Sequence, residues 1–463
     1  MIVPRSKLLF WVAAIVLPFA LLGAVAPAAT AVSWLCIGGL FLVVIVDAIG
    51  ARNSLAEIGV ELSAVTRMSK DRAAKLEMRV RNGRQQQKNL RVALAWPCEL
   101  ETPIEEMDTV LPAQSEWSRL VWTCTPRRRG NCKITSAFVE GVSPLGFWAV
   151  RKALPVLAEI RVYPSLLDER KNLAALFLNR GGPGLHAQRQ VGKGRDFEKL
   201  REYVPGDGYD EIHWKATARR GRPVTKVFQI ERTQEIYVIV DASRLSARQP
   251  EIGAPVSDPA RSEKQPQRAG SETGAPTTLE RFVTAALVLG LAAEKQGDLF
   301  GLITFTDKVE KFVRAKNGTA HYHACRDALY TLQPKIVTPD FDELCTFIRL
   351  RLRRRALLVF LTALDDPTVA ENFVRNVDLI RRQHLVLVNM IQPPGVQPLF
   401  ANPKVADTDD LYQQLGGHLR WQNLRALQKN LQRRGVQFSL NANERLSAEI
   451  VSQYLAVKQR QLL

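Results

Sequence analysis

The chain of 463 residues has few of the side chains and motifs that active sites and zinc sites use. It contains six histidines and six cysteines, and no two cysteines form a CxxC pair. It lacks the GxxxxGK[ST] loop that binds nucleotide phosphates, so we expect the chain itself not to hydrolyse nucleotide. No serine or cysteine nucleophile stands at a recognisable spacing from a histidine. These absences favour a role other than catalysis.

Charged side chains are also missing from Leu8 to Val46. A short break at Pro27–Thr30 separates two apolar runs, Leu8–Ala26 and Ala31–Ile49, the second with Asp47 at its edge. Each run approaches the roughly 20 residues that span a bilayer, and a backbone in lipid must satisfy its own hydrogen bonds. The sequence therefore predicts an N-terminal transmembrane helical hairpin.

The basic residues around the two runs predict the orientation of this hairpin. Arg5 and Lys7 precede the first run, Arg52 follows the second, and no lysine or arginine lies between them. The positive-inside rule places both outer ends in the cytoplasm, so everything after Arg52 is expected to be cytoplasmic. The alternative, a cleaved signal peptide, is disfavoured because the first run is long and a second follows at once.

The composition is basic, with 64 Lys and Arg against 46 Asp and Glu and a formal net charge of +18. Such a charge suits an anionic membrane surface or nucleic acid. No run interleaves basic and aromatic residues as single-strand binding grooves do. We therefore expect a basic surface next to membrane lipid, and nucleic acid is an unlikely partner.

Short stretches of alternating apolar and polar residues predict a β-sandwich-like domain at 53–165. Its number of strands and their spacing favour a small antiparallel sandwich, immunoglobulin-like in outline. The expected strands are 58–65, 76–80, 90–94, 118–124, 132–139 and 147–150.

The next segment, 166–234, contains the densest mixture of charges and large rings in the chain. We predict that the rings of Phe197, Tyr203 and Trp214 are apolar anchors that pack against the protein. The charged side chains around them are expected to form ion pairs. The expected bases are Arg195, Arg201, Lys215 and Arg219, and the expected acids are Asp196, Glu198, Glu202 and Asp207. A catalytic reading would use His213 as a base beside Asp207 or Asp210, without a nucleophile to accompany it.

Strands alternate with helices from 235 to 463, which predicts a doubly wound α/β domain with a parallel sheet. Continuous apolar runs mark the buried strands. The segment 246–278 has almost no large apolar residue and is predicted to be a disordered insertion. The expected strands are 235–241, 299–305, 356–361, 385–391 and 436–440, and the expected helices are 279–295, 320–332, 340–354, 367–382, 409–434 and 443–455.

The dense segment also carries a recognisable motif, GxGxxDFxxLRxYxPGD followed by IxWKATAR. This motif resembles the signature of the bacterial family called domain of unknown function 58. The N-terminal hairpin, Arg129-Gly130, the segment 143–148 and the α/β half agree with the same family. The signature residues are Asp196, Phe197, Leu200, Arg201, Tyr203, Pro205, Gly206, Asp207, Trp214, Lys215, Thr217 and Arg219.

The resemblance implies a protein of the bacterial inner membrane with a von Willebrand factor A-like domain. It also implies a partner, a MoxR-type AAA+ ATPase, and an assembly role on an unknown client protein. No reaction is established for the family. The leading hypothesis is therefore a membrane-anchored interaction factor, and the alternative is a metal-assisted hydrolase using Asp207, His213 and Asp241.

The A-domain resemblance further implies a Mg²⁺ site at the carboxyl ends of the parallel strands. Leu245 stands where the second serine of that site belongs, and Ala363 stands where its later acid belongs. Asp365 can take the place of this missing acid only after a shift of its loop. We therefore expect no cofactor, or weakly bound Mg²⁺. The candidate metal ligands are Asp241, Ser243 and Thr319.

Overall fold

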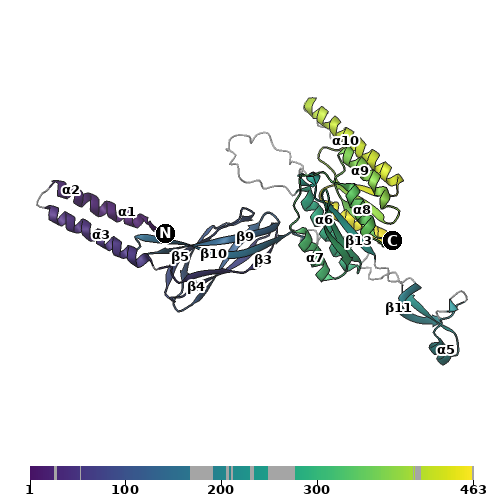
Figure 1. Ribbon diagram of the computed structural model, residues 1–463, viewed down its shortest axis with the longest axis horizontal. Coiled ribbons are helices and arrows are strands. Elements are labelled where there is room, and N and C mark those ends of the chain that lie inside the picture. Colours follow the sequence, from purple (N-terminus) through teal and green to yellow (C-terminus); the bar gives the residue numbers. More distant parts are fainter. Residues whose placement is uncertain are drawn as a thin grey trace. The chain divides into compact units, whose positions relative to one another are not determined.

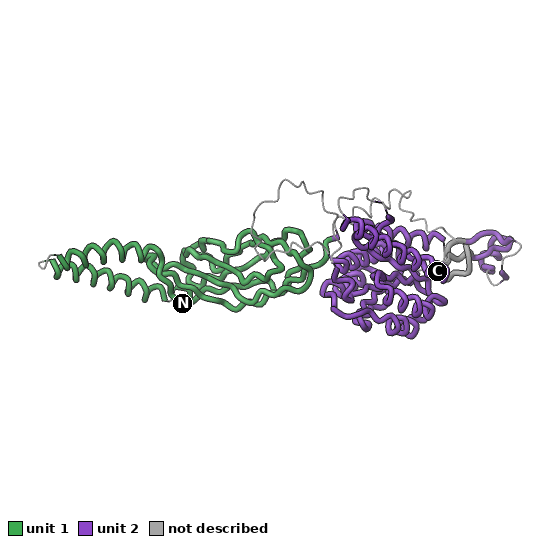
Figure 2. The backbone as a smooth tube through the Cα atoms, turned by 90° about the horizontal axis from the view of Figure 1, so that it is seen from above, with its two compact units in different colours: residues 1–165 green, residues 166–463 purple. Residues whose placement is uncertain are grey.

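The computed structural model divides the chain into two compact units, Met1–Ser165 and Leu166–Leu463, which are coloured green and purple in Figure 2. Most of the predicted insertion at 246–278 lies outside the described residues, as do Pro205, Gly206 and Asp207 of the signature. The structure describes residues 1–25, 29–52, 54–166, 191–204, 208–209, 212–229, 234–248, 277–399, 401 and 408–460.

Two apolar helical segments lie near the start of the first unit, side by side in Figure 1. Both are long and apolar enough to cross a membrane, so the prediction of two such helices is confirmed. Pro18 has no N–H to donate to the carbonyl of Ala14, which accounts for a wide π-helical turn in the first segment. The first segment comprises α1 (Ser6–Trp11), η1 (Val12–Val16) and α2 (Leu17–Val25), and the second is α3 (Thr30–Arg52).

Two β-sheets follow and enclose one hydrophobic core. One has the order β1-β10-β9-β5-β7, with β3 also paired to β10, and the other has the order β2-β4-β8-β6. Leu76, Met78 and Val80 are fully buried while the residues between them are exposed, as the period of two predicts. The strands are β1 (Ile2–Pro4), β2 (Ile58–Leu62), β3 (Val65–Ser69), β4 (Ala74–Asn82), β5 (Lys88–Leu94), β6 (Leu100–Glu101), β7 (Glu106–Leu111), β8 (Trp117–Pro126), β9 (Gly130–Val142) and β10 (Trp148–Tyr163).

Two strands of this domain differ from the prediction. The strand expected at 58–65 is divided into β2 and β3, and β3 pairs with β10 in parallel rather than antiparallel. The strand expected at 147–150 continues to Tyr163. Pro155 obscured that continuation in the sequence, but it lies where the register between β10 and β9 shifts, and a proline is tolerated at such an irregularity.

Asp47, near the end of α3, joins the helices to the β-sheets within the first unit. Its side chain is buried, and its carboxylate accepts hydrogen bonds from Ser143 Oγ at 2.6 Å, from the Leu145 amide at 2.9 Å and from the Phe147 amide at 3.3 Å. A carboxylate satisfied by several donors is stable away from water. The segment 143–148, which the family resemblance singles out, is therefore the loop that receives the end of α3.

The second unit contains an antiparallel pair of strands, β11 (Val191–Glu202) and β12 (Val224–Gln229), with the short helix α5 (Trp214–Arg220) between them in the chain. We call residues 191–229 the signature hairpin. Its strands were not predicted, because its many charges favoured an interpretation as paired ions rather than as a sheet.

The rest of the second unit is a six-stranded sheet with helices on both faces, as Figure 1 shows around β13. The order is β15-β14-β13-β16-β17-β18; all neighbours are parallel except β15, which is antiparallel to β14. One core contains residues of α6, α7 and α11, and the other contains residues of α8, α9 and α10. The strands are β13 (Glu235–Asp241), β14 (Leu299–Phe305), β15 (Val309–Lys316), β16 (Leu357–Leu361), β17 (Leu385–Ile391) and β18 (Gln437–Asn441), and the helices are α6 (Thr278–Lys295), α7 (Thr319–Leu329), α8 (Phe341–Arg351), α9 (Pro367–Asn376), α10 (Thr408–Arg433) and α11 (Leu446–Gln459).

Candidate functional site

The carboxyl edge of the parallel sheet contains a buried acid, Asp241, at the end of β13. One carboxylate oxygen accepts a hydrogen bond from the Ser243 amide at 2.8 Å, and the other accepts one from Thr362 Oγ1 at 2.6 Å. Burial raises the pKa of Asp241, and these hydrogen bonds oppose that rise. Both oxygens of the acid are therefore already engaged by the protein.

Two arginines pair with the two acids that follow β16 at this edge. They lie on or just after the 3-10 helix η4 (Arg244–Ala247), which follows β13. Arg244 pairs with Asp366 at 3.5 Å, and Arg248 pairs with Asp365, the residue that the sequence offered as a substitute metal ligand. No group of three or more His, Cys, Asp or Glu residues suited to a metal occurs among the residues that the structure describes.

The structure places Thr319 at the opposite edge of the sheet from Asp241. Strand β15 runs antiparallel to β14, with Lys316 opposite Phe300, whereas Asp241 lies opposite Phe305 at the other end of β14. Because Thr319 directly follows β15, the predicted set of Asp241, Ser243 and Thr319 does not come together. The error arose because β15 was not predicted, so the residues after it were assigned to the carboxyl edge.

A different loop lies beside Asp241, and no pattern in the sequence indicated it. The Lys335 amide donates to the Ala242 carbonyl at 2.8 Å, and the Arg244 amide donates to the Val337 carbonyl at 3.0 Å. Between them Ile336 is 91% exposed. The carboxyl edge is thus a surface of ion pairs and one apolar tip rather than an assembled cation site.

We expect magnesium calorimetry on the detergent-solubilised chain to give no saturable heat at low millimolar concentration. Removing both cations with Arg244→Ala and Arg248→Ala leaves Asp365 and Asp366 unpaired, so this variant should bind Mg²⁺ at least about tenfold more tightly. The matched control removes two exposed arginines of the same unit, Arg349 and Arg353, and should bind no better than wild type. Tight binding by the unaltered chain would contradict the interpretation.

The second candidate surface is on the signature hairpin. Trp214 was predicted to be an apolar anchor, but its side chain is 69% exposed. Tyr209 and Val204 are also exposed, at 78% and 52%. Tyr203 is half-buried and its ring stacks on Tyr209 with centroids 6.4 Å apart. A seven-residue helix on a two-stranded ribbon has too little neighbouring surface to cover a tryptophan on every side.

Basic side chains accompany these rings. Arg222 pairs with Glu202 at 2.7 Å, and Glu202 is the only acid among the described side chains of the hairpin. The predicted pairing of Glu202 with a signature base is therefore replaced by a pair with Arg222. The side chains of Asp196 and Phe197, with Pro205, Gly206 and Asp207, lie outside the described residues. We define the hairpin surface as the exposed residues Val204, Tyr209, Trp214, Lys215, Arg219 and Arg220.

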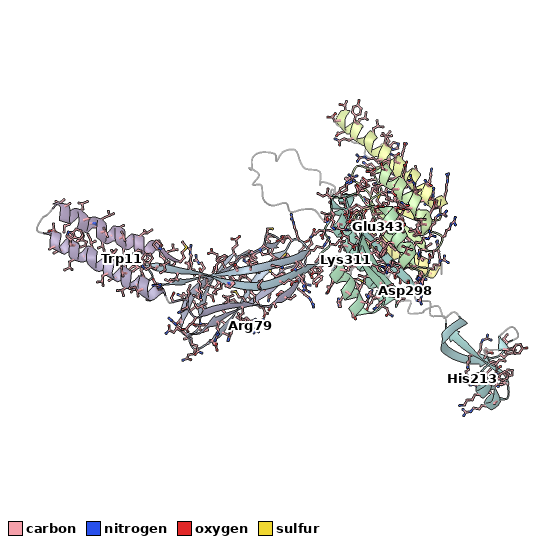
Figure 3. The ribbon with its side chains drawn as sticks, in the orientation of Figure 1. Trp11, Arg79, His213, Asp298, Lys311 and Glu343 are labelled. Atoms are coloured by element: carbon pink, nitrogen blue, oxygen red, sulfur yellow. The ribbon has the colours of Figure 1, made fainter. Side chains whose placement is uncertain are left out.

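Other residues of this segment, His213 among them, stabilise the hairpin itself. His213, labelled in Figure 3, accepts a hydrogen bond from the Ala216 amide at 3.0 Å through Nδ1 and so caps α5. Thr217 Oγ1 accepts a bond from the Val224 amide at 3.1 Å, which ties α5 to β12. Leu200 and Arg201 are half-buried on β11. One ring nitrogen of His213 is thus engaged as a cap, which leaves it less suited to act as a general base.

The sequence comparison agrees with the motif. Residues 199–249 and 265–399 match the profile of the family described as protein of unknown function DUF58. The resemblance inferred from the signature is thereby confirmed, and the matched residues include α5, β13 and the carboxyl-edge loops. No curated protein sequence matches the chain.

Several solved structures are similar to part of the chain. The conserved hypothetical protein BatB from Bacteroides thetaiotaomicron is 13% identical, with 49% of this chain and 99% of that chain covered and a TM-score of 0.27. An aerotolerance-related membrane protein from Bacteroides fragilis NCTC 9343 is 12% identical, with 48% and 97% covered and a TM-score of 0.25. Proximal thread matrix protein 1 from the mussel byssus is 11% identical, with 48% and 44% covered and a TM-score of 0.24.

Proposed function

We propose that the chain is a two-pass protein of the bacterial inner membrane that holds its soluble domains in the cytoplasm and acts as a protein-interaction or assembly factor. Its proposed partner is a MoxR-type AAA+ ATPase, and the two act together on a client complex. The chain itself carries out no catalysis. The observation that carries this proposal is the hairpin surface, an exposed set of rings and cations on the segment that defines the family.

Strand pairing supports the two-pass topology. Strand β1 precedes the first apolar helix, strand β10 follows the second, and the two are paired from Ile2–Val150 to Pro4–Trp148. Partners in one sheet must lie on the same side of a membrane. The chain between them therefore crosses an even number of times, as two membrane-spanning helices do. The positions of Arg5, Lys7 and Arg52 favour the cytoplasmic side.

The chemistry of the hairpin surface supports a protein partner. Exposed tryptophan, tyrosine and arginine are the side chains that dominate binding energy at protein interfaces. The excess of cations favours an acidic partner surface and accelerates association at low salt. At the carboxyl edge, by contrast, Asp241, Asp365 and Asp366 each already pair with a group of this chain.

We expect the substitution Trp214→Ala to weaken retention of a purified MoxR-type ATPase by at least about tenfold, because a central tryptophan contributes about 2 kcal/mol or more to an interface. Retention is measured on the immobilised, detergent-solubilised chain and quantified by mass spectrometry. Trp117→Ala is the matched control, since Trp117 is an exposed tryptophan of the β-sheets at 41% exposure. Equal loss in both variants, or no retention by the unaltered chain, would refute the proposal.

A further inference from the structure

A groove of about 550 Å³ lies between the two apolar helices and is lined almost entirely by apolar side chains. Val12 and Val16 on one wall belong to the π-helical turn that precedes Pro18. A turn of this kind is wider than an α-helical turn and is often found at functional positions. The other wall is α3, from Ile37 to Arg52.

The end of the groove beside the β-sheets has a fixed aromatic wall. Trp148 lines the groove, and its indole Nε1 donates a hydrogen bond to the Val44 carbonyl of α3 at 3.1 Å. This bond satisfies the polar atom of the indole and holds its ring in place. The described residues that line the groove include no acid, and the carboxylate of Asp47 is engaged by the loop 143–148.

Among the described residues that line the groove, only Arg52, at the same end, is charged. Its side chain is exposed, and no ion pair or side-chain hydrogen bond joins it to another described residue. A guanidinium presents several donors in a planar fork that matches a phosphate group. The groove therefore combines an apolar channel with a phosphate-binding group at its membrane-surface end.

We propose that this groove is a binding site for one anionic phospholipid, with an acyl chain along the helices and the headgroup phosphate at Arg52. Fifteen helical residues separate Ile37 from Arg52, which corresponds to about 22 Å. Half of a bilayer is about 15 Å of hydrocarbon plus its headgroup layer, so the groove matches the depth of one leaflet. The inference rests only on the membrane-anchoring part of the proposed function and is independent of any ATPase partner.

Native mass spectrometry of the detergent-solubilised full chain tests the site. Phosphatidylglycerol and phosphatidylcholine with identical acyl chains are added in equal amounts. We expect one bound phosphatidylglycerol per chain, preferred over phosphatidylcholine by at least about fivefold. Arg52→Gln should abolish the preference while leaving a weak phosphatidylcholine signal, and Arg52→Lys should restore part of it because the charge returns without the planar fork.

The matched control is Arg5→Gln, which removes a charge from the outer end of the first apolar segment without altering the groove lining. The Arg5→Gln variant should still prefer phosphatidylglycerol to phosphatidylcholine. Ala48→Trp and, separately, Val12→Trp fill the groove from opposite walls and should reduce the signals of both lipids.

Three results would overturn the proposal: no preference in the unaltered chain, equal loss in Arg5→Gln and Arg52→Gln, or a dimer mass in place of the lipid adduct, which would mean that a second copy fills the groove. Resistance of the chain to alkaline carbonate extraction from membranes separately establishes anchoring, so failure of the lipid site is distinguishable from failure of the anchor.

Discussion

Replacing Asp298 with alanine is expected to lower the free energy of unfolding of the α/β half by about 3 kcal/mol. Asp298, labelled in Figure 3, precedes β14 and is 2% exposed. Its carboxylate accepts hydrogen bonds from Lys458 Nζ at 2.8 Å, from the Gln234 amide at 3.2 Å and from the Tyr454 hydroxyl. The change would leave three donors without this acceptor in a largely buried setting.

This cluster connects both ends of the six-stranded domain. Tyr454 and Lys458 belong to α11, the last helix, whereas Gln234 directly precedes β13, the first of the sheet's strands along the chain. Burial and the neighbouring Asp298 charge raise the pKa of Tyr454, so its hydroxyl stays protonated and donates. The loss of Asp298 should therefore weaken the attachment of α11 as well as the start of the sheet.

The measurement is urea unfolding of the detergent-solubilised chain, followed by the reaction of its thiols with a maleimide and identification of the labelled peptides by mass spectrometry. Cys36, Cys98, Cys124 and Cys132 belong to the first unit, whereas Cys325 and Cys345 are fully buried in the α/β half, so labelling of these two alone reports on its unfolding. Asp378→Ala is the matched control, because Asp378 also pairs with two cations, Arg381 and Arg434, but is 39% exposed. In the control variant, the free energy of unfolding of the α/β half should fall by about 1 kcal/mol or less. Losses of equal size in the two variants would mean that burial of Asp298 contributes nothing.

The α/β half is expected to lose about 3 kcal/mol of stability between pH 6.5 and pH 4 through one side chain, His384. It precedes β17 and is 4% exposed, and neither ring nitrogen has a hydrogen-bond partner among the described residues. Burial lowers the pKa of His384 from 6.5 to about 4. Below pH 6.5 the unfolded chain binds a proton that the folded chain does not bind until about pH 4, so stability falls as the pH falls.

His384→Leu removes the group that titrates and should flatten the stability curve in this pH range. The same thiol-reaction assay, run with a reagent that reacts below neutral pH, measures the curve. His323→Leu, at an exposed position of α7, is the control and should leave the slope unchanged. A slope that persists in His384→Leu would assign the acid sensitivity to other groups.

The sequence predicted the most buried strands correctly but missed β15, one of the two edge strands of the six-stranded sheet. The bounds of β13, β14 and β17 agree with the predicted runs, because strands covered on both faces are continuously apolar. Strand β15 is a half-exposed edge strand in which charged and apolar residues are mixed without a strict period of two, so it resembles a loop in composition. Its omission displaced Thr319 to the wrong edge of the sheet.

The candidate sites were predicted in part, for a related reason. The sequence identified Asp241 at a strand end and the density of rings and charges around Trp214. It could not indicate that Arg244 and Arg248 neutralise the neighbouring acids, because those pairs join segments far apart in the chain. The exposure of Trp214 was also unpredictable, since it depends on how much surface the neighbouring elements offer.

The pairing of β1 with β10 has a consequence for biogenesis. Residues 2–4 are made before both apolar helices, yet their strand partners, residues 148–150, are made only after those helices and most of the β-strands of the first unit. That edge of the sheet is therefore completed late in synthesis. A bulky segment fused directly before β1 should hinder this late step even though it is made earlier.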